Sequence, residues 1–243
     1  MAFRFRILTS IGLLLLTTAG FAYTPGKFYY QGKTTEKIIA LTFDDGPGHF
    51  TVPILDLLKQ HNIRATFFME GSQVETYPEI AKQVADAGHE IGNHTYIHFD
   101  YHKAKNAAPQ RLAHELAQTE SALQRAVGIQ TQVVRMPYGY YNHSWLMPLM
   151  KEKNYALVHW SYGEDWMAYR WKDPKTKTIK ITLTPDVMAA DYIANAKPGA
   201  VFLFHDGGRH RQRTLDAVKI VIETLEKQGY RFIPAEEMFQ DEK

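Results

Sequence analysis

The stretch Ile38-Ile39-Ala40-Leu41-Thr42-Phe43-Asp44-Asp45-Gly46-Pro47-Gly48 joins an apolar run to two adjacent carboxylates and a turn. The run up to Phe43 has the composition of a buried strand, and Gly-Pro-Gly is typical of a strand end. Because successive side chains of a strand point to opposite faces, Asp44 and Asp45 can serve one site only where the strand ends. Two close carboxylates suit a metal ligand beside a general base, although Asp-Asp-Gly is also common as a solvated turn.

Strand-like and helix-like segments alternate along the rest of the chain. We expect strands at 65–69, 89–92, 132–135, 155–160, 200–204 and 230–233, and helices at 52–60, 78–87, 109–127, 144–153, 185–196 and 213–228. Residues 166–183 are expected to be irregular and polar. About seven strand–helix units over roughly 200 residues favour an α/β fold whose parallel sheet closes, or nearly closes, into a single-domain barrel.

Residues 1–22 have the pattern of a secretory signal peptide. Arg4 and Arg6 precede an apolar run, and small residues stand before an expected cleavage after Ala22. The run is shorter than the ~20 apolar residues of a spanning helix, although a retained anchor is the alternative. We therefore expect export to the periplasm, the cell envelope or the outside of a bacterium, with no membrane span after cleavage. The expected organisation is a signal at 1–22, a short lead at 23–35, one domain at 36–238 and a tail at 239–243.

The composition excludes several classes of protein. The chain has 243 residues, of which 45% are hydrophobic, and it contains no cysteine. It can bury a sizeable core, but disulfide scaffolds, zinc–thiolate sites and cysteine nucleophiles are excluded. Any metal must be held by His, Asp or Glu. Without the leader arginines, basic and acidic residues are equal in number, so no nucleic-acid partner is indicated. The sequence does not predict an oligomeric state.

Polar residues follow several of the expected strands, and barrel enzymes carry their chemistry at that end of the strands. His94 and His98 are four residues apart, a spacing at which two imidazoles can reach one cation. Arg135 could pair with a carboxylate, and His205 is a candidate acid or base near neutral pH. Alone, each of these residues has a purely structural interpretation. The basic cluster 209–213 could contact an anionic glycan or simply begin a solvated helix.

The ordered motifs T-F-D-D-G at 42–46, H-T-x-x-H at 94–98, R-x-P-Y-G at 135–139, D-W at 165–166 and L-x-H-D at 203–206 resemble those of the polysaccharide deacetylase family. This is carbohydrate esterase family 4, with its NodB homology domain, and the resemblance covers about 36–238. It implies a distorted (β/α)7 barrel. It also implies a metal-dependent hydrolase that removes N-acetyl groups from an amino-sugar glycan such as peptidoglycan, chitin-type oligomers or poly-N-acetylglucosamine, releasing acetate.

The resemblance also implies roles for individual residues. The metal, expected to be Zn²⁺ with another divalent transition metal as the alternative, would be held by Asp45, His94 and His98. Catalysis would rest on Asp44 as base, Arg135 as the partner that orients it, and His205 as general acid. The residues expected to contact the substrate or the oxyanion are Tyr138, Asp165, Trp166 and Leu203; of these, Tyr138 would offer a backbone N–H, Trp166 a groove wall and Leu203 part of the acetyl pocket.

One position departs from the family pattern. The fourth motif is often D-x-x-D-W, and its first Asp pairs with the catalytic His, but Tyr162 stands at that place. Either Asp165 supplies the carboxylate or His205 has no carboxylate partner. Two other functions therefore stay open. One is an O-acetyl esterase of the acetylxylan type, whose leaving group needs less help from an acid. The other is a non-catalytic, metal-containing glycan-binding protein.

Overall fold

The computed structural model describes residues 23–103, 108–169, 183–208 and 210–240, so the expected signal at 1–22 lies outside the described residues. The eight strands form one parallel sheet in the order β1-β6-β5-β4-β3-β2-β7, and β8 pairs with β2. The strands are β1 Phe28–Tyr29, β2 Ile38–Gly46, β3 Thr66–Met69, β4 Glu90–Asn93, β5 Val133–Val134, β6 Ala156–Val158, β7 Ala200–His205 and β8 Arg231–Ile233.

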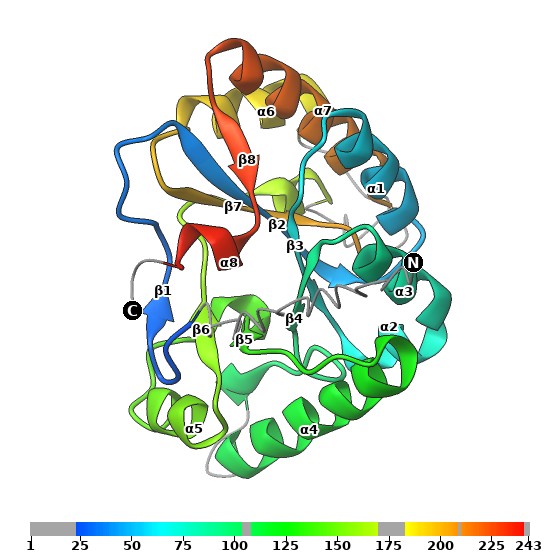
Figure 1. Ribbon diagram of the computed structural model, residues 1–243, viewed down its shortest axis with the longest axis vertical. Helices are drawn as coiled ribbons and strands as arrows, with labels where there is room; N and C mark the ends of the chain where they lie inside the picture. Colours follow the sequence, from blue (N-terminus) through cyan, green and yellow to red (C-terminus); the bar gives the residue numbers. More distant parts are fainter. Residues whose placement is uncertain (1–22, 104–107, 170–182, 209, 241–243) are drawn as a thin grey trace, which may run out of the picture.

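The helices surround this sheet, as Figure 1 shows. They are α1 Thr51–Gln60, α2 Gly71–Thr76, α3 Pro78–Asp86, α4 Ala108–Val127, α5 Leu146–Glu152, α6 Pro185–Ala194, α7 Gln212–Lys227 and α8 Ala235–Met238, with 3-10 helices at Tyr101–Lys103, Pro137–Gly139 and Asp165–Tyr169. The ends of the sheet approach each other, because Tyr162 bridges to Phe202 and Gln31 bridges to Ala200. The sheet is thus a nearly closed barrel. Within the described residues, no helix is long and apolar enough to cross a membrane.

Alternation along β2 separates the two sides of the barrel wall. Ile39, Leu41 and Phe43 belong to the cluster that includes the apolar faces of α1 and α7. Ala40 belongs instead to the smaller cluster with strand residues of β6 and β7. Residues two apart share a face of a strand, so Asp44 lies on the same, inward side as Ala40. The strand that buries the outer core therefore also aims a carboxylate into the barrel.

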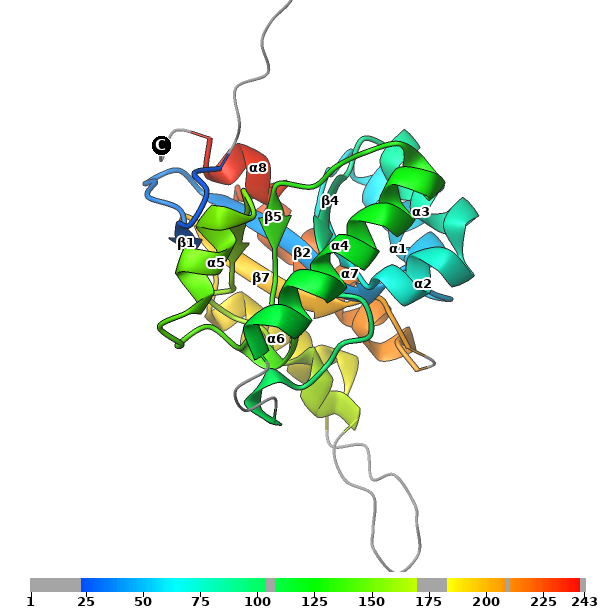
Figure 2. The ribbon, with the colours of Figure 1, turned by 90° about the horizontal axis from the view of Figure 1, so that it is seen from below.

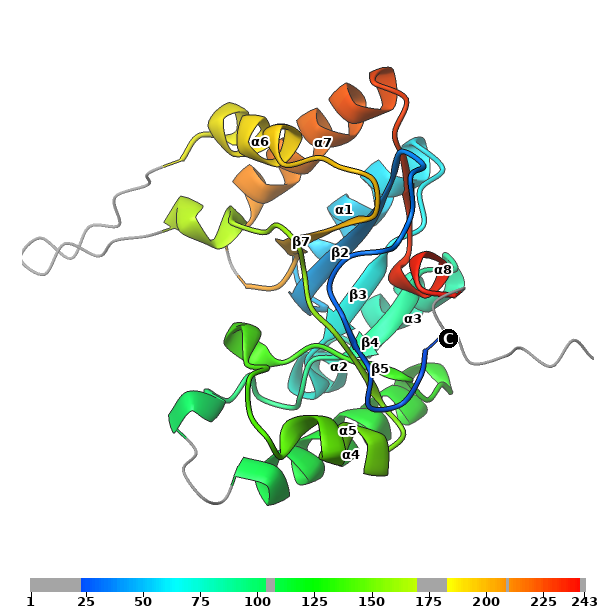
Figure 3. The same cartoon turned by 90° about the vertical axis from the view of Figure 1, so that its left-hand side faces the viewer.

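Both ends of the described chain close the base of the barrel. The Tyr23 hydroxyl donates to Glu90 Oε1 at 2.6 Å, and the backbone N–H of Glu236 in α8 donates to Glu90 Oε2 at 2.9 Å. The ring of Phe239 lies 4.7 Å from that of Tyr29 and is fully buried. In Figures 2 and 3, α8 and the 3-10 helix Asp165–Tyr169 (yellow-green) lie at opposite ends of the molecule. The base of the barrel thus lies away from the strand ends where polar residues gather.

The observed elements agree with the expected ones to within a few residues. Gly88 and Gly229 follow helices with φ of +76° and +84°, the left-handed conformation that ends a helix without strain in glycine. Among the strands and α-helices, three short ones were not predicted: β1, α2 and α8. The lead 23–35 contributes β1, and Phe239 contributes a buried ring, so the fold extends beyond the expected limits 36 and 238. Of the stretch expected to be irregular, residues 166–169 belong to the 3-10 helix Asp165–Tyr169, and residues 170–182 lie outside the described residues.

Replacing Phe239 tests whether the C-terminal segment belongs to the fold. Phe239→Ala should lower the free energy of unfolding by about 3–5 kcal/mol, because it removes a fully buried ring and leaves a cavity. Urea unfolding followed by circular dichroism measures this. Val187→Ala, at a 48% exposed position of α6, is the matched control and should change little. A loss below about 1 kcal/mol for Phe239→Ala would place this residue outside the cooperative core.

Candidate active site and metal centre

A bulge at the end of β2 lets two consecutive aspartates face one site. Asp44 pairs in register with Phe68, but the next pairing with β3 is made by Gly46, so Asp45 is the extra residue. Its φ is +72°. As a result, Asp44 Oδ2 and Asp45 Oδ1 lie 3.7 and 3.4 Å from the same atom, His94 Nε2. The sequence predicted the strand end, and the bulge is how the chain achieves the shared orientation.

Asp45, His94 and His98 form a cluster that fits a metal ion. Asp45 Oδ1 lies 3.4 Å from Nε2 of each histidine, close to the spacing of about 3.3 Å between tetrahedral ligands placed ~2 Å from zinc. His94 Nδ1 donates to the Arg135 carbonyl at 2.8 Å, which leaves its Nε2 lone pair directed at the cluster. Asp45 Oδ1 is buried and has no hydrogen-bond partner among the described residues. Burial raises the pKa of Asp45, but His205 and His94 outweigh burial and hold it below its usual value.

A buried carboxylate accepts hydrogen bonds from the backbone of the segment that carries both histidines. Glu115 of α4 is 3% exposed, and its Oε2 accepts hydrogen bonds from the backbone N–H groups of Tyr96 and Ile97 at 3.3 and 3.5 Å. Asn93 Oδ1 accepts from the N–H of Thr95 at 3.0 Å. These contacts stabilise a segment in which Thr95 and His98 both have positive φ. Sequence analysis missed Glu115, because its spacing on α4 does not reveal which loop the helix supports.

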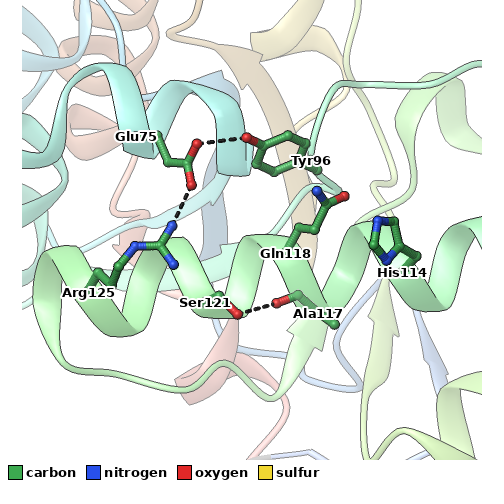
Figure 4. Close-up of a pocket in the computed structure, with 7 residues that line it drawn as sticks. All are labelled: Glu75, Tyr96, His114, Ala117, Gln118, Ser121 and Arg125. Carbon is green, nitrogen blue, oxygen red and sulfur yellow. Dashed lines mark hydrogen bonds and ion pairs between the residues drawn. The ribbon is translucent and has the colours of Figure 1, made fainter.

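The far side of this segment faces a shallow hollow between α2 and α4, shown in Figure 4. There the Tyr96 hydroxyl donates to Glu75 Oε2 at 2.7 Å, and Glu75 also pairs with Arg125. Glu75, Tyr96 and Arg125 thus satisfy one another, which indicates that they anchor the histidine segment to α2.

Arg135 and Asp44 form a buried ion pair in the barrel interior. The Arg135 side chain is fully buried, and its Nη1 donates to Asp44 Oδ1 at 2.9 Å and to Thr42 Oγ1 at 2.7 Å. Nε and Nη2 donate to the carbonyls of Val158 and His159, both at 3.1 Å. The guanidinium therefore holds the Asp44 carboxylate in one orientation beside the metal cluster.

His205 has a carboxylate partner, and that partner is Asp165. His205 Nδ1 donates to Asp165 Oδ1 at 2.6 Å, while Asp165 Oδ2 accepts from the N–H of His205 and from Thr214 Oγ1. Burial lowers the pKa of His205, but Asp165 and Asp45 outweigh it and raise the pKa to about 9. Asp165 is fully buried and does not line the pocket, so its carboxylate faces His205 and not the position expected for a substrate contact. Tyr162 instead bridges β7 and packs edge-on against Tyr192.

A pocket of about 450 Å³ brings these groups together at the carboxyl ends of the strands. Trp166 is 39% exposed and Tyr138 is 62% exposed, and both line the pocket. Of the ten residues named from the sequence, Arg135 and Asp165 lie behind its wall. The other eight line the pocket: Asp44, Asp45, His94, His98, Tyr138, Trp166, Leu203 and His205. Four further lining residues were not assigned there: Met136, Gly139, Trp160 and Arg211.

Arg211, from the basic cluster 209–213, reaches the site. Its Nε donates to the Gly207 carbonyl at 2.7 Å, and its Nη2 lies 3.5 Å from Asp45 Oδ2. Arg209 lies outside the described residues.

A parallel barrel with a two-histidine, one-aspartate cluster, a second aspartate and a carboxylate-supported histidine defines a class of hydrolases. The family model described as polysaccharide deacetylase matches residues 31–158. The chain belongs to this family, and the expected distorted (β/α)7 barrel and the class of hydrolase acting on carbon–nitrogen bonds are confirmed.

Named relatives agree with this assignment. A peptidoglycan-N-acetylglucosamine deacetylase of Bacillus cereus is 36% identical over 88% of this chain and 94% of its own length. A peptidoglycan-N-acetylmuramic acid deacetylase of Bacillus subtilis is 33% identical over 88% of this chain and 76% of its own length. A crystal structure of a peptidoglycan N-acetylglucosamine deacetylase superposes with a TM-score of 0.77 at 34% identity, covering 89% of this chain and 94% of that one.

The metal cluster can be tested by binding alone. His94→Ala should weaken Zn²⁺ binding by more than about a hundredfold, because it removes a ligand and not merely the partner of one. Calorimetric titration of the metal-free protein measures this. His114→Ala, on the surface of α4, is the matched control and should bind Zn²⁺ as the unaltered protein does. Equal affinities for His94→Ala and the unaltered protein would rule out this cluster as the site.

Proposed function

We propose that this protein hydrolyses the acetamide of N-acetylglucosamine residues in peptidoglycan, with Zn²⁺ held by Asp45, His94 and His98. One observation carries the proposal. A single pocket presents the metal cluster, the Asp44 carboxylate fixed by Arg135, and the imidazole of His205 fixed by Asp165. Two of the relatives above are peptidoglycan N-acetylglucosamine deacetylases, which supports the choice of sugar. The wall polymer lies outside the cytoplasmic membrane, which agrees with the expected export of the chain.

The protein's own groups supply a base and a substrate-binding surface. When bound, Zn²⁺ would polarise the acetyl carbonyl and make a water molecule more acidic. Asp44 accepts the proton of the attacking water, and the hydrogen bond from Arg135 keeps its carboxyl group oriented. The backbone N–H of Tyr138 faces the developing oxyanion; one such donor contributes ~3–4 kcal/mol of barrier lowering. Leu203 borders the acetyl methyl group, and Trp166 stacks on the sugar.

The leaving nitrogen must gain a proton, because an amide anion is a poor leaving group. His205 donates this proton as the carbon–nitrogen bond breaks. Its pKa of about 9 keeps the imidazole protonated at neutral pH. The products are acetate, which receives the water oxygen, and a free amino sugar. The intact His205–Asp165 pair supports amide cleavage over the two alternatives, since an ester needs less help from an acid and a binding protein needs none.

Acetate release tests the reaction directly. The protein is incubated with peptidoglycan, N-acetylglucosamine oligomers and acetylxylan, after chelation and again after Zn²⁺ is restored. We expect zinc-restored release from the N-acetylated substrates, and analysis of the digested wall should find free amines on glucosamine. Free amines on muramic acid would show that N-acetylmuramic acid, and not N-acetylglucosamine, is the sugar that the protein deacetylates. Release from acetylxylan alone would establish the esterase, and bound Zn²⁺ without release would establish the binding protein.

Asp44→Asn tests the assignment of the base. The amide cannot accept the water proton, so the rate should fall by about 10²–10⁴-fold, while Zn²⁺ binding should survive because Asp45, His94 and His98 remain. Acetate release and zinc content are measured on the same sample. Asp186→Asn, on the surface of α6, should keep both. A rate near that of the unaltered protein would remove Asp44 from this role.

Asp165→Asn tests the acid through pH. The change removes the charge that raises the pKa of His205, so His205 loses its proton at lower pH. The alkaline limb of kcat/KM against pH should therefore move to lower pH, by about one unit or more. Asp186→Asn again serves as the control. An unmoved alkaline limb would show that the pKa of His205 does not set it.

A further inference from the structure

A row of aromatic rings leads out of the active pocket. Trp160 lines the pocket, and its ring stacks on His159 with centroids 3.9 Å apart. His159 contacts Tyr141 at 5.0 Å, Tyr141 stacks on Phe28 at 5.3 Å, and Phe28 stacks on Tyr30 at 6.1 Å. We call these five residues the aromatic strip. Each ring contacts the next, so the strip is continuous from the active pocket to the outer surface.

Strand pairing explains how residues distant in the sequence form the strip. Phe28 pairs with Leu157 and Tyr29 with Val158, and Figure 1 shows β1 and β6 side by side. Tyr29 and Val158 belong to a buried cluster, so Phe28 and Tyr30 point to the opposite, outer side. The strip thus crosses the wall where β1, missed by sequence analysis, completes the sheet.

The loop that follows Arg135 is pressed against the strip. A Cβ on Gly139 would lie 2.8 Å from the Trp160 ring and 3.1 Å from His159, and the φ of Gly139 is +66°. Only glycine fits this approach without strain. The same loop supplies Tyr138 to the pocket and Tyr141 to the strip, so it links the two surfaces.

Part of the strip is exposed to solvent, unlike the rings of a hydrophobic core. Tyr30 is 53% exposed and Tyr141 is 48% exposed. Of the six large hydrophobic residues that are exposed in the described part of the chain, three lie at the pocket or its histidine segment and two on the strip; only Val187 lies elsewhere. Single exposed apolar residues are common, but a contiguous set joined to a pocket marks a binding surface.

We propose that the aromatic strip binds pyranose rings of the substrate glycan on one side of the sugar being deacetylated. Aromatic faces stack on the apolar faces of sugars, and the phenol hydroxyls of Tyr30 and Tyr141 can bond to sugar hydroxyls. Burial and nearby Arg135 lower the pKa of His159 to about 4, so its ring is neutral at working pH and suits an uncharged sugar. The substrate is therefore a chain of several sugars. This inference rests on the proposed function.

The test compares a short and a long substrate. Acetate release is measured from the N-acetylglucosamine disaccharide and hexasaccharide with the double variant Tyr30→Ala, Tyr141→Ala. We expect kcat/KM for the hexasaccharide, relative to the disaccharide, to fall about tenfold through KM, the loss expected for one or two ring contacts. The double variant Tyr30→Phe, Tyr141→Phe keeps the rings and should recover most of the affinity. Val187→Ala should behave as the unaltered protein.

Binding separates this inference from the proposed function. If the unaltered protein releases no acetate, the proposed function fails, and calorimetric binding of the hexasaccharide decides the strip, with an expected tenfold loss for the alanine double variant. An unchanged preference for the long oligomer, or an equal loss for both lengths, would overturn the strip as a subsite. Failure of the hexasaccharide to bind the unaltered protein would overturn it as well.

Discussion

The buried ion pair between Arg135 and Asp44 is the interaction around which the barrel interior is organised. A buried guanidinium needs acceptors for its N–H groups, and here it donates four hydrogen bonds, to Thr42, to Asp44 and to the carbonyls of Val158 and His159 at the end of β6. Removing one partner of such a pair costs roughly 3–5 kcal/mol, because the other charge stays buried. The arrangement ties β2, β5 and β6 to one point. The position of Asp44, the proposed base, and the integrity of the interior therefore depend on the same contacts.

The bulge at Asp45 separates two carboxylates that are adjacent in sequence but differ in surroundings. Asp44 faces a fixed cation, Arg135, inside the wall, whereas Asp45 faces His94 and His98 at the rim. Gly207 packs against this bulge so closely that a Cβ would lie 2.0 Å from the Asp45 carbonyl oxygen. The different surroundings of the two aspartates thus depend on Gly207, which follows β7 and has no side chain to displace the bulge.

Sequence analysis predicted the barrel and most strand ends, because buried runs and polar strand ends are local patterns, and eight of its ten candidate residues line one pocket. It could not predict β1, since a segment of two residues has no periodicity of its own and is a strand only because it pairs with β6. It left the partner of His205 open, because only spatial proximity shows that Asp165 reaches the ring. Glu115 and the aromatic strip escaped for the same reason. Glu115 reaches Tyr96 and Ile97 across 19 and 18 positions, and Tyr141 joins the two halves of the strip by contacts with His159 and Phe28 at least 18 positions away; no spacing rule encodes such pairs.

The closed base of the barrel has a consequence for how the domain can be handled and attached. Tyr23 and Phe239 lie near each other, with ring centroids 6.4 Å apart, on the side away from the pocket. A carrier, bead or second domain attached on this side of the molecule would leave the pocket facing outward. The same proximity means that a short linker could join these two positions in a circularly permuted chain, with new ends opened in a surface turn.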